Sequence, residues 1–199
     1  MRRVSAGRRM YNLMKYKRVI QRKCRLNLIE QPIVDNFPSL ERIAMNNWLD
    51  LKQIIPGLHT DRWLHVVNSP LLPLVNVLSE NNFSVFIIDG SKIIDSKSLF
   101  EEAKNVFEFP DYFGENWNAW TDCLGDFEVS LNQSTAIIWD NADKSFMSDV
   151  YTFIQAVFDL YNMAINAGFA RIRSEPCQVE VFLVGNSEGF KNVFDFKQK

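Results

Sequence analysis

The stretch that decides the fold is FPDYFGENWNAWTDCLGDF, from Phe109 to Phe127. It contains two of the five tryptophans of the chain and four acidic residues, but no lysine, arginine or histidine. Pro110 disfavours a helical conformation at the residue before it, and Gly114 permits the positive φ of a tight turn. The sequence therefore predicts a loop over the first residues and a helix that begins at Glu115 or Asn116.

This helix is expected to have two different faces, because successive side chains are about 100° apart around its axis. One face holds the large apolar side chains Trp117, Trp120 and Leu124. The adjoining face holds only small or polar side chains: Asn118, Thr121, Asp122 and Gly125. An amphipathic surface helix with a solvated polar face is the ordinary interpretation. The high aromatic density and the acidic polar face without lysine favour a binding surface instead.

The segment DYFGENWNAWTDCL resembles the signature helix of the barstar family, intracellular inhibitors of secreted microbial ribonucleases. The shared positions are Tyr112-Phe113, Gly114-Glu115-Asn116, Ala119 and Asp122-Cys123-Leu124. The resemblance extends from about residue 83 to residue 184, which is about half of the chain. It implies an α/β fold with a three-stranded parallel sheet packed by helices.

The resemblance also implies a protein partner. Inhibitors of this family place carboxylates where a basic ribonuclease holds substrate phosphates with Arg and Lys. The predicted partner-binding residues are Tyr112, Gly114, Asn116, Asn118, Thr121, Asp122, Asp126 and Asp159. Asn118 stands where the family pattern has an aspartate, Thr121 where it has a tryptophan, and Asp159 near a second contact acid. These departures leave open whether the partner is a barnase-type ribonuclease, while the fold implied by the resemblance is retained.

Apolar periodicity in the rest of the chain predicts alternating helices and short strands. Helices are expected at residues 39–51, 69–80, 98–107 and 147–167, the second with Ser69 as N-cap and the last ended by Gly168. Strands are expected at residues 63–67, 84–88, 136–139 and 178–184, and the first two with the helix between them suggest a βαβ unit. Residues 84–88 are typical of a strand covered on both faces, and residues 178–184 of an edge strand. We expect a buried core that includes Val85, Ile87, Ile137, Phe153 and Val157.

The predicted fold class is therefore α/β, with a small barstar-like parallel β-sheet of three or four strands packed by helices. The domain organisation follows the resemblance and the charge. Residues 1–30 form a basic N-terminal tail, residues 31–82 a mainly helical extension of unknown role, and residues 83–199 the barstar-like domain.

Charge is distributed unevenly along the chain. The 22 basic and 24 acidic residues give a net charge of −2, but the first 25 residues carry ten Arg or Lys and no acid. Residues 26–199 therefore have a net charge of −12. Such an acidic body repels nucleic acid and favours a basic protein partner. The tail itself has several interpretations: a solvated end, a contact for nucleic acid or an anionic surface, a targeting leader, or an artefact of an upstream start codon.

Catalytic and metal sites have little support in the sequence. Cys24, Cys123 and Cys177 have no paired spacing, and His59 and His65 lie far from them, so neither a zinc site nor a Cys-His dyad is indicated. The acids of the central segment could form an acid/base pair or hold a divalent cation, but without converging ligands these are weak alternatives. We expect no catalytic residue, no metal and no cofactor.

The expected location is the cytoplasm. Cys123 and Cys177 lie among apolar residues and are interpreted as core thiols, and few, odd-numbered cysteines suit a reducing compartment. The sequence has no run of about 18 apolar residues and no apolar stretch typical of a secretory signal, so no membrane span is expected. The oligomeric state stays open.

Together these observations predict a cytoplasmic, non-catalytic inhibitor or immunity protein that binds a basic ribonuclease or toxin through an acidic, aromatic helix. The alternative is an interaction protein that keeps the barstar-like fold but has lost ribonuclease inhibition. The two differ in whether Tyr112, Asp122 and Asp159 form one exposed surface, which only the inhibitor requires.

Overall fold

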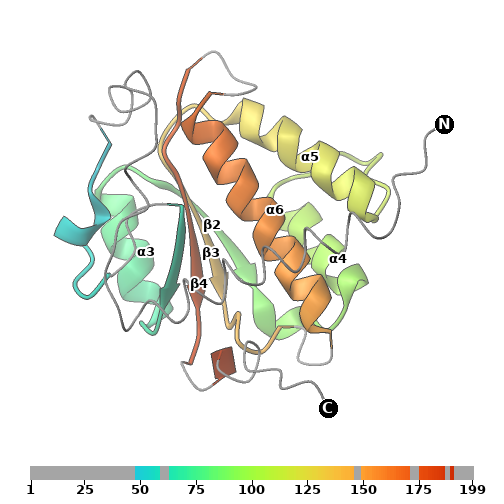
Figure 1. The fold of residues 1–199 in the computed structure, drawn as a ribbon, viewed down its shortest axis with the longest axis horizontal. Helices are drawn as coiled ribbons and strands as arrows, with labels where there is room; N and C mark the ends of the chain where they lie inside the picture. Colours follow the sequence, from blue (N-terminus) through green and yellow to red (C-terminus); the bar gives the residue numbers. More distant parts are fainter. Residues whose placement is uncertain (1–47, 59–62, 146–148, 171–174, 187–188, 191–199) are drawn as a thin grey trace.

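The computed structural model describes residues 48–58, 63–145, 149–170, 175–186 and 189–190 (Figure 1). Its centre is a sheet of four parallel strands in the order β1-β4-β3-β2. The strands are β1 (Leu64–Val67), β2 (Ser84–Asp89), β3 (Thr135–Asp140) and β4 (Val179–Val184). The predicted α/β class with a small parallel sheet is confirmed. The basic tail and residues 39–47 of the first predicted helix lie outside the described residues.

Helices cover both faces of the sheet (Figure 1). One face carries α4 (Ser96–Val106), α5 (Trp117–Ser130) and α6 (Val150–Gly168); the other carries α3 (Leu71–Glu80) and the segment of residues 48–58. Two short 3₁₀ turns, η3 (Leu51–Gln53) and η4 (Gly90–Lys92), complete the described elements. Because β1 and β2 lie at opposite edges, α3 crosses one whole face between them, and the predicted βαβ unit joins strands that are not neighbours.

The sheet reverses the positions that we predicted for two strands. β2, expected to be covered on both faces, is an edge strand in which Val85 is only half-buried and Ile87 is 37% exposed. β4, expected at an edge, lies between β1 and β3, and all six of its residues are buried. Ile137, Phe153 and Val157 are buried as predicted.

A buried group of polar contacts explains why β4 tolerates a central position; we call it the polar clasp. The Glu180 carboxylate accepts a hydrogen bond from the Trp63 backbone N–H (2.5 Å), and one of its oxygens lies 2.9 Å from His65 Nε2. Gln178 Nε2 donates to Glu180 Oε1 (3.0 Å) and to the Leu49 carbonyl (2.9 Å), while the Leu49 N–H donates to Gln178 Oε1 (3.1 Å). Buried polar groups are stable when they are paired in this way. The partners come from residues 49–65, far from β4 in the sequence.

Two apolar cores lie on the two faces of the sheet. The larger core, under α4, α5 and α6, is rich in phenylalanine and tryptophan. The smaller one is mostly aliphatic and joins α3 and the segment of residues 48–58 to the sheet, with Leu51, Leu78, Ile138 and Phe182 among its buried members. Residues 48–80 therefore belong to the same sheet structure as the later elements. The predicted division at residues 30 and 82 stays a prediction.

Several helix ends differ from the predicted ones. Trp48–Asp50 is not helical, so the helix predicted up to Leu51 does not reach its expected end. Helix α3 begins at Leu71 after Pro70, without a side-chain cap from Ser69. Gly168 is the last residue of α6 rather than a stop beyond it. A Cβ at this glycine would stand only 3.0 Å from the Trp48 ring, so close packing explains the residue.

Candidate functional site

The loop before α5 is anchored by two phenylalanines that point inward. Phe109 and Phe113 are buried, with ring centroids 5.1 Å apart, and Phe113 also packs edge-on against Phe100 at 5.9 Å. The Phe113 N–H donates to the Pro110 carbonyl at 2.9 Å and closes a turn. Tyr112 lies next to an anchored residue but points the other way, with 77% of its surface exposed.

Asn116 begins α5 and also holds the preceding loop. Its Oδ1 accepts hydrogen bonds from the N–H groups of Asn118 and Ala119, both at 3.1 Å, which is the N-cap arrangement. Its Nδ2 donates to the Gly114 carbonyl at 2.9 Å. The positive φ that we expected at Gly114 occurs at Glu115 instead (+46°). A Cβ at Gly114 would stand 2.8 Å from Asn116 Nδ2, so the glycine makes room for the capping side chain.

The inner face of α5 rests on the aromatic core. Trp120 and Leu124 are buried as predicted, together with Cys123 and Phe127. Trp117 is only half-buried, which corrects the prediction. It stands in the first turn of the helix beside the exposed loop, where it packs edge-on against Phe100 at 5.2 Å. This packing leaves α5 little freedom to rotate about its axis.

The outer face of α5 is polar and exposed. Its exposed side chains are Asn118, Thr121, Asp122, Asp126 and Val129. The Thr121 hydroxyl donates to the Trp117 carbonyl at 3.0 Å, so its hydrogen is already used within the helix. Val129, 54% exposed, adds an apolar contact that the sequence analysis did not assign. Its helical spacing from Asp122 and Asp126 was the available signal.

Four exposed carboxylates define what we call the acidic surface: Asp111, Glu115, Asp122 and Asp126. Among the described residues only Asp111 has an ion-pair partner, Lys104, at 3.8 Å. Burial raises the pKa of the Cys123 thiol, and the nearby carboxylates of Asp126 and Asp122 raise it further. Cys123 is therefore protonated and poorly suited to act as a nucleophile.

Asp159 lies on the neighbouring helix α6, which packs alongside α5 (Figure 1). It is half-buried, and Gln155 Nε2 donates to both of its carboxylate oxygens at 2.9 and 3.0 Å. Gln155 thus orients this acid, a role that its i, i+4 spacing would have suggested. Of the eight predicted binding residues, the seven from Tyr112 to Asp126 lie on one loop–helix unit, and Asp159 lies on the next helix.

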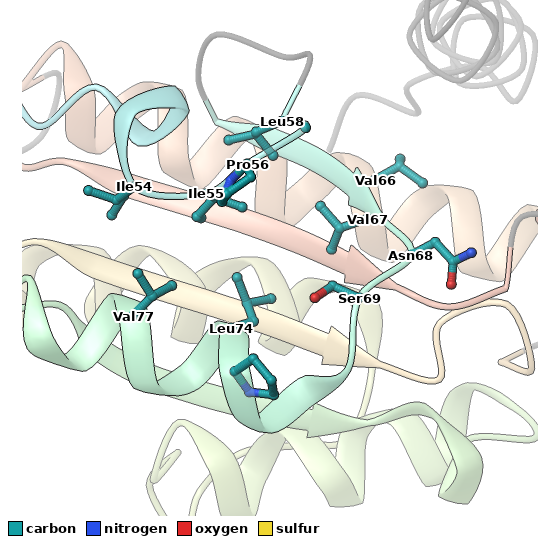
Figure 2. A pocket seen from close by; sticks show the side chains of 12 residues that line it. Ile54, Ile55, Pro56, Leu58, Val66, Val67, Asn68, Ser69, Leu74 and Val77 are labelled. Atoms are coloured by element: carbon teal, nitrogen blue, oxygen red, sulfur yellow. The ribbon is translucent and has the colours of Figure 1, made fainter.

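A metal site and a pocket are two features that an enzyme would use beside its catalytic residues. Within the described part of the chain, no three His, Cys, Asp or Glu residues are placed to hold a metal ion. A pocket of about 470 Å³ lies between residues 54–58, the end of β1 and α3, with Leu58, Val67, Leu74 and Val77 in its wall (Figure 2). No charged residue lines it, and it lies on the face of the sheet opposite α5.

The described helices include none that is long and apolar enough to cross a membrane.

Comparison with known proteins agrees with this arrangement. Residues 83–177 match the family described as Barstar (barnase inhibitor), and this range contains β2, α4, α5, β3, α6 and the acidic surface. No curated protein matches the chain significantly. The matched range begins just before β2 and leaves β1, α3 and all of β4 outside it. Residues 83–177, a little under half of the chain, are therefore similar to the barstar family.

Proposed function

We propose that this protein is a cytoplasmic inhibitor or immunity protein that binds a basic ribonuclease or toxin through the acidic surface and Tyr112. The observation that carries the proposal is the contrast within one loop–helix unit. Its inner face is fixed by aromatic packing, while its outer face presents an exposed aromatic ring beside carboxylates that have few cations around them. A rigid, charged and partly aromatic surface suits protein recognition.

The mechanism is occupation of the partner's phosphate-binding site. A ribonuclease binds its substrate with Arg and Lys side chains, and a carboxylate can accept the same charge-assisted hydrogen bonds without being cleaved. Asp122 is the central anion in this proposal, and Asp159, oriented by Gln155, is a second one. Tyr112 supplies an exposed ring with a hydroxyl, the kind of anchor that often dominates interface energies. No residue of this chain needs to transfer a proton.

The first test is inhibition of a barnase-like ribonuclease by the full chain. The expected result is dose-dependent inhibition that Asp122→Ala weakens by at least about 2 kcal/mol, roughly thirtyfold in Kd, because partner cations stay buried and unpaired. Costs of this kind are known from complexes that include barnase with barstar. Glu80→Ala is the matched control, since Glu80 is an exposed acid on α3 across the sheet. Equal losses for both variants would refute the assigned surface.

A second test restores the family pattern. Asn118→Asp adds a carboxylate to the exposed face of α5, and Thr121→Trp adds a large ring beside it. We expect Asn118→Asp to tighten binding to a barnase-like enzyme, and Thr121→Trp to do so where the partner surface has room. Inhibition should also weaken as salt rises, since charges are screened over roughly 10 Å at 0.1 M. If neither the wild type nor either variant inhibits at micromolar concentration, the ribonuclease proposal fails.

The second candidate function is an interaction protein that keeps the fold without inhibiting a ribonuclease. Two positions favour it: Asn118 lacks the family's charge, and the Thr121 hydroxyl is bonded to its own helix. A pull-down from the source lysate and secretome with wild-type and Asp122→Ala baits separates the candidates. Capture of a basic nuclease by the wild type alone supports the inhibitor. Loss of a different protein from the Asp122→Ala bait supports the alternative.

A further inference from the structure

We propose that the basic N-terminal segment, residues 1–25, docks on the acidic surface of α5 and competes with the protein partner. The competition rests on the proposed function, whereas the contact itself does not. Three observations lead to it: the charge of the segment, the unpaired acids of the surface, and the place where the described chain begins.

The charges of the two regions are complementary. Residues 1–25 contain ten Arg or Lys and no Asp or Glu. On the acidic surface, Glu115, Asp122 and Asp126 are exposed and have no ion pair within the described residues. Tyr112, in the loop before α5, is also exposed and offers a ring face on which an Arg guanidinium can stack. No other segment of similar length in this chain combines so many cations with no acid.

The described chain begins at Trp48, beside the end of the helix that packs along α5. The Trp48 ring packs against Gly168 at the end of α6, where its nearest atom is 3.0 Å from the position a Cβ would occupy. Helix α6 has 19 residues, so it is roughly 28 Å long. It packs alongside α5 (Figure 1). The 22 residues from 26 to 47 can span up to roughly 70–80 Å when extended. The basic segment can therefore reach every part of α5.

The tether makes even a weak contact significant. Two groups joined by a short stretch of chain meet at an effective concentration that can reach the millimolar range. Exposed ion pairs are individually weak and are screened by salt, so the expected contact is reversible. A segment that covers the surface nine-tenths of the time would lower the apparent affinity for a partner about tenfold. A partner that binds tightly would displace it, and a weak basic competitor would be excluded.

Cys24 provides a direct test in the full chain without any partner. It is the cysteine of the basic segment, and the other two, Cys123 and Cys177, are buried. A nitroxide label at Cys24 should broaden the amide signals of residues 111–126 at 20 mM salt. The broadening should disappear at 0.5 M salt and weaken in Asp122→Asn with Asp126→Asn. Glu80→Gln, the matched control on α3, should leave it unchanged.

Several results would overturn the proposal. Signals of residues 111–126 that are not broadened at low salt would do so. Broadening that persists in high salt, or in the Asp122 and Asp126 variants, would also do so. A segment that leaves these signals unaffected but binds a short RNA oligonucleotide would replace the proposal with a nucleic-acid contact.

A kinetic measurement tests the competition separately. In the full chain, Lys15, Lys17, Arg18, Arg22, Lys23 and Arg25 are replaced by Gln. This variant should bind a barnase-like ribonuclease about two- to tenfold more tightly than the wild type at low salt, and equally at 0.5 M salt. Unchanged or weaker binding at low salt would refute the competition. Absence of binding by both proteins would refute the proposed function, while the label experiment still decides whether the contact exists.

Discussion

The outer face of α5 and the start of β4 both carry polar side chains, but those of α5 are exposed and those at β4 are buried. Glu180 on β4 and Gln178 just before this strand are buried, and their polar atoms bond to Leu49, Trp63, His65 and each other. On α5, the Asp122 carboxylate is exposed and has no hydrogen-bond partner among the described residues. The difference teaches that a polar side chain contributes to folding where the chain supplies its partner. Where the chain supplies none, the side chain remains free for another molecule.

This comparison predicts how stability should divide among four substitutions. The apolar base of α5 should matter most, the buried polar clasp next, the cap of α5 less, and the acidic surface least. Each can be measured as a change in the free energy of unfolding by denaturant titration.

The largest effect is expected for Trp120→Ala. The Trp120 side chain is fully buried and contacts Trp117, Phe100 and Phe109. Truncation leaves a cavity in the larger core and should cost about 3–5 kcal/mol. Trp117→Ala is the control, and it should cost clearly less because that ring is half-exposed. Equal costs would contradict the description of an inner face that fixes α5.

The polar clasp is tested by Glu180→Gln, which keeps the shape of the side chain. The amide offers one oxygen where the carboxylate offers two, so a donor among Trp63 N–H, His65 and Gln178 loses its acceptor. A buried unsatisfied group costs about 1–3 kcal/mol, and we expect a loss in this range. Glu80→Gln, at an exposed site, should change stability by less than about 0.5 kcal/mol. A loss below that limit for Glu180→Gln would mean that the clasp does not stabilise the fold.

The clasp also shows what the sequence could and could not predict. Elements with their own periodicity were predicted. In α5, Trp120 and Leu124 are buried as expected, and the strands at residues 64–67 and 135–140 occur near their expected positions. The order of the strands was not predicted. The apolar run of β2 suggested a central strand, and the polar residues Gln178 and Glu180 suggested that the strand at residues 178–184 lies at an edge. Local patterns report which residues are apolar, but the partners of Gln178 and Glu180 lie more than 100 residues away.

The candidate site was predictable to a different extent. The exposure of Asn118, Thr121 and Asp122 follows from the helical wheel. The exposure of Tyr112 depends on Phe109 and Phe113 turning inward, and the orientation of Asp159 depends on Gln155. Such contacts are set by packing, which a single sequence does not specify. The binding role of all eight residues stays a prediction.

The third prediction concerns Asn116, a side chain that is exposed like those of the acidic surface but bonded within the chain like those of the polar clasp. It is exposed, yet its side chain bonds two N–H groups of α5 and the Gly114 carbonyl. Asn116→Ala should therefore cost about 1 kcal/mol, as is typical for loss of an N-cap. Asn116→Asp is the matched control, because it keeps the capping oxygen and should retain most of the stability. If Asn116→Ala is neutral, the cap does not hold the loop that presents Tyr112.

The smallest effect on stability is expected for Asp122→Ala. The carboxylate is exposed and makes no hydrogen bond within the described residues, and alanine favours a helix at least as well as aspartate. The free energy of unfolding should therefore change by no more than about 0.5 kcal/mol. The substitution should also lower the pKa of the Cys123 thiol, because it removes one of the two charges that raise it beyond the effect of burial. Asp126→Ala should lower that pKa more, since Asp126 is the stronger of the two neighbours. Denaturant titration and the pH dependence of Cys123 labelling measure these effects. A large loss of stability in Asp122→Ala would mean that this acid serves the fold, and its proposed place at a partner surface would lose its support.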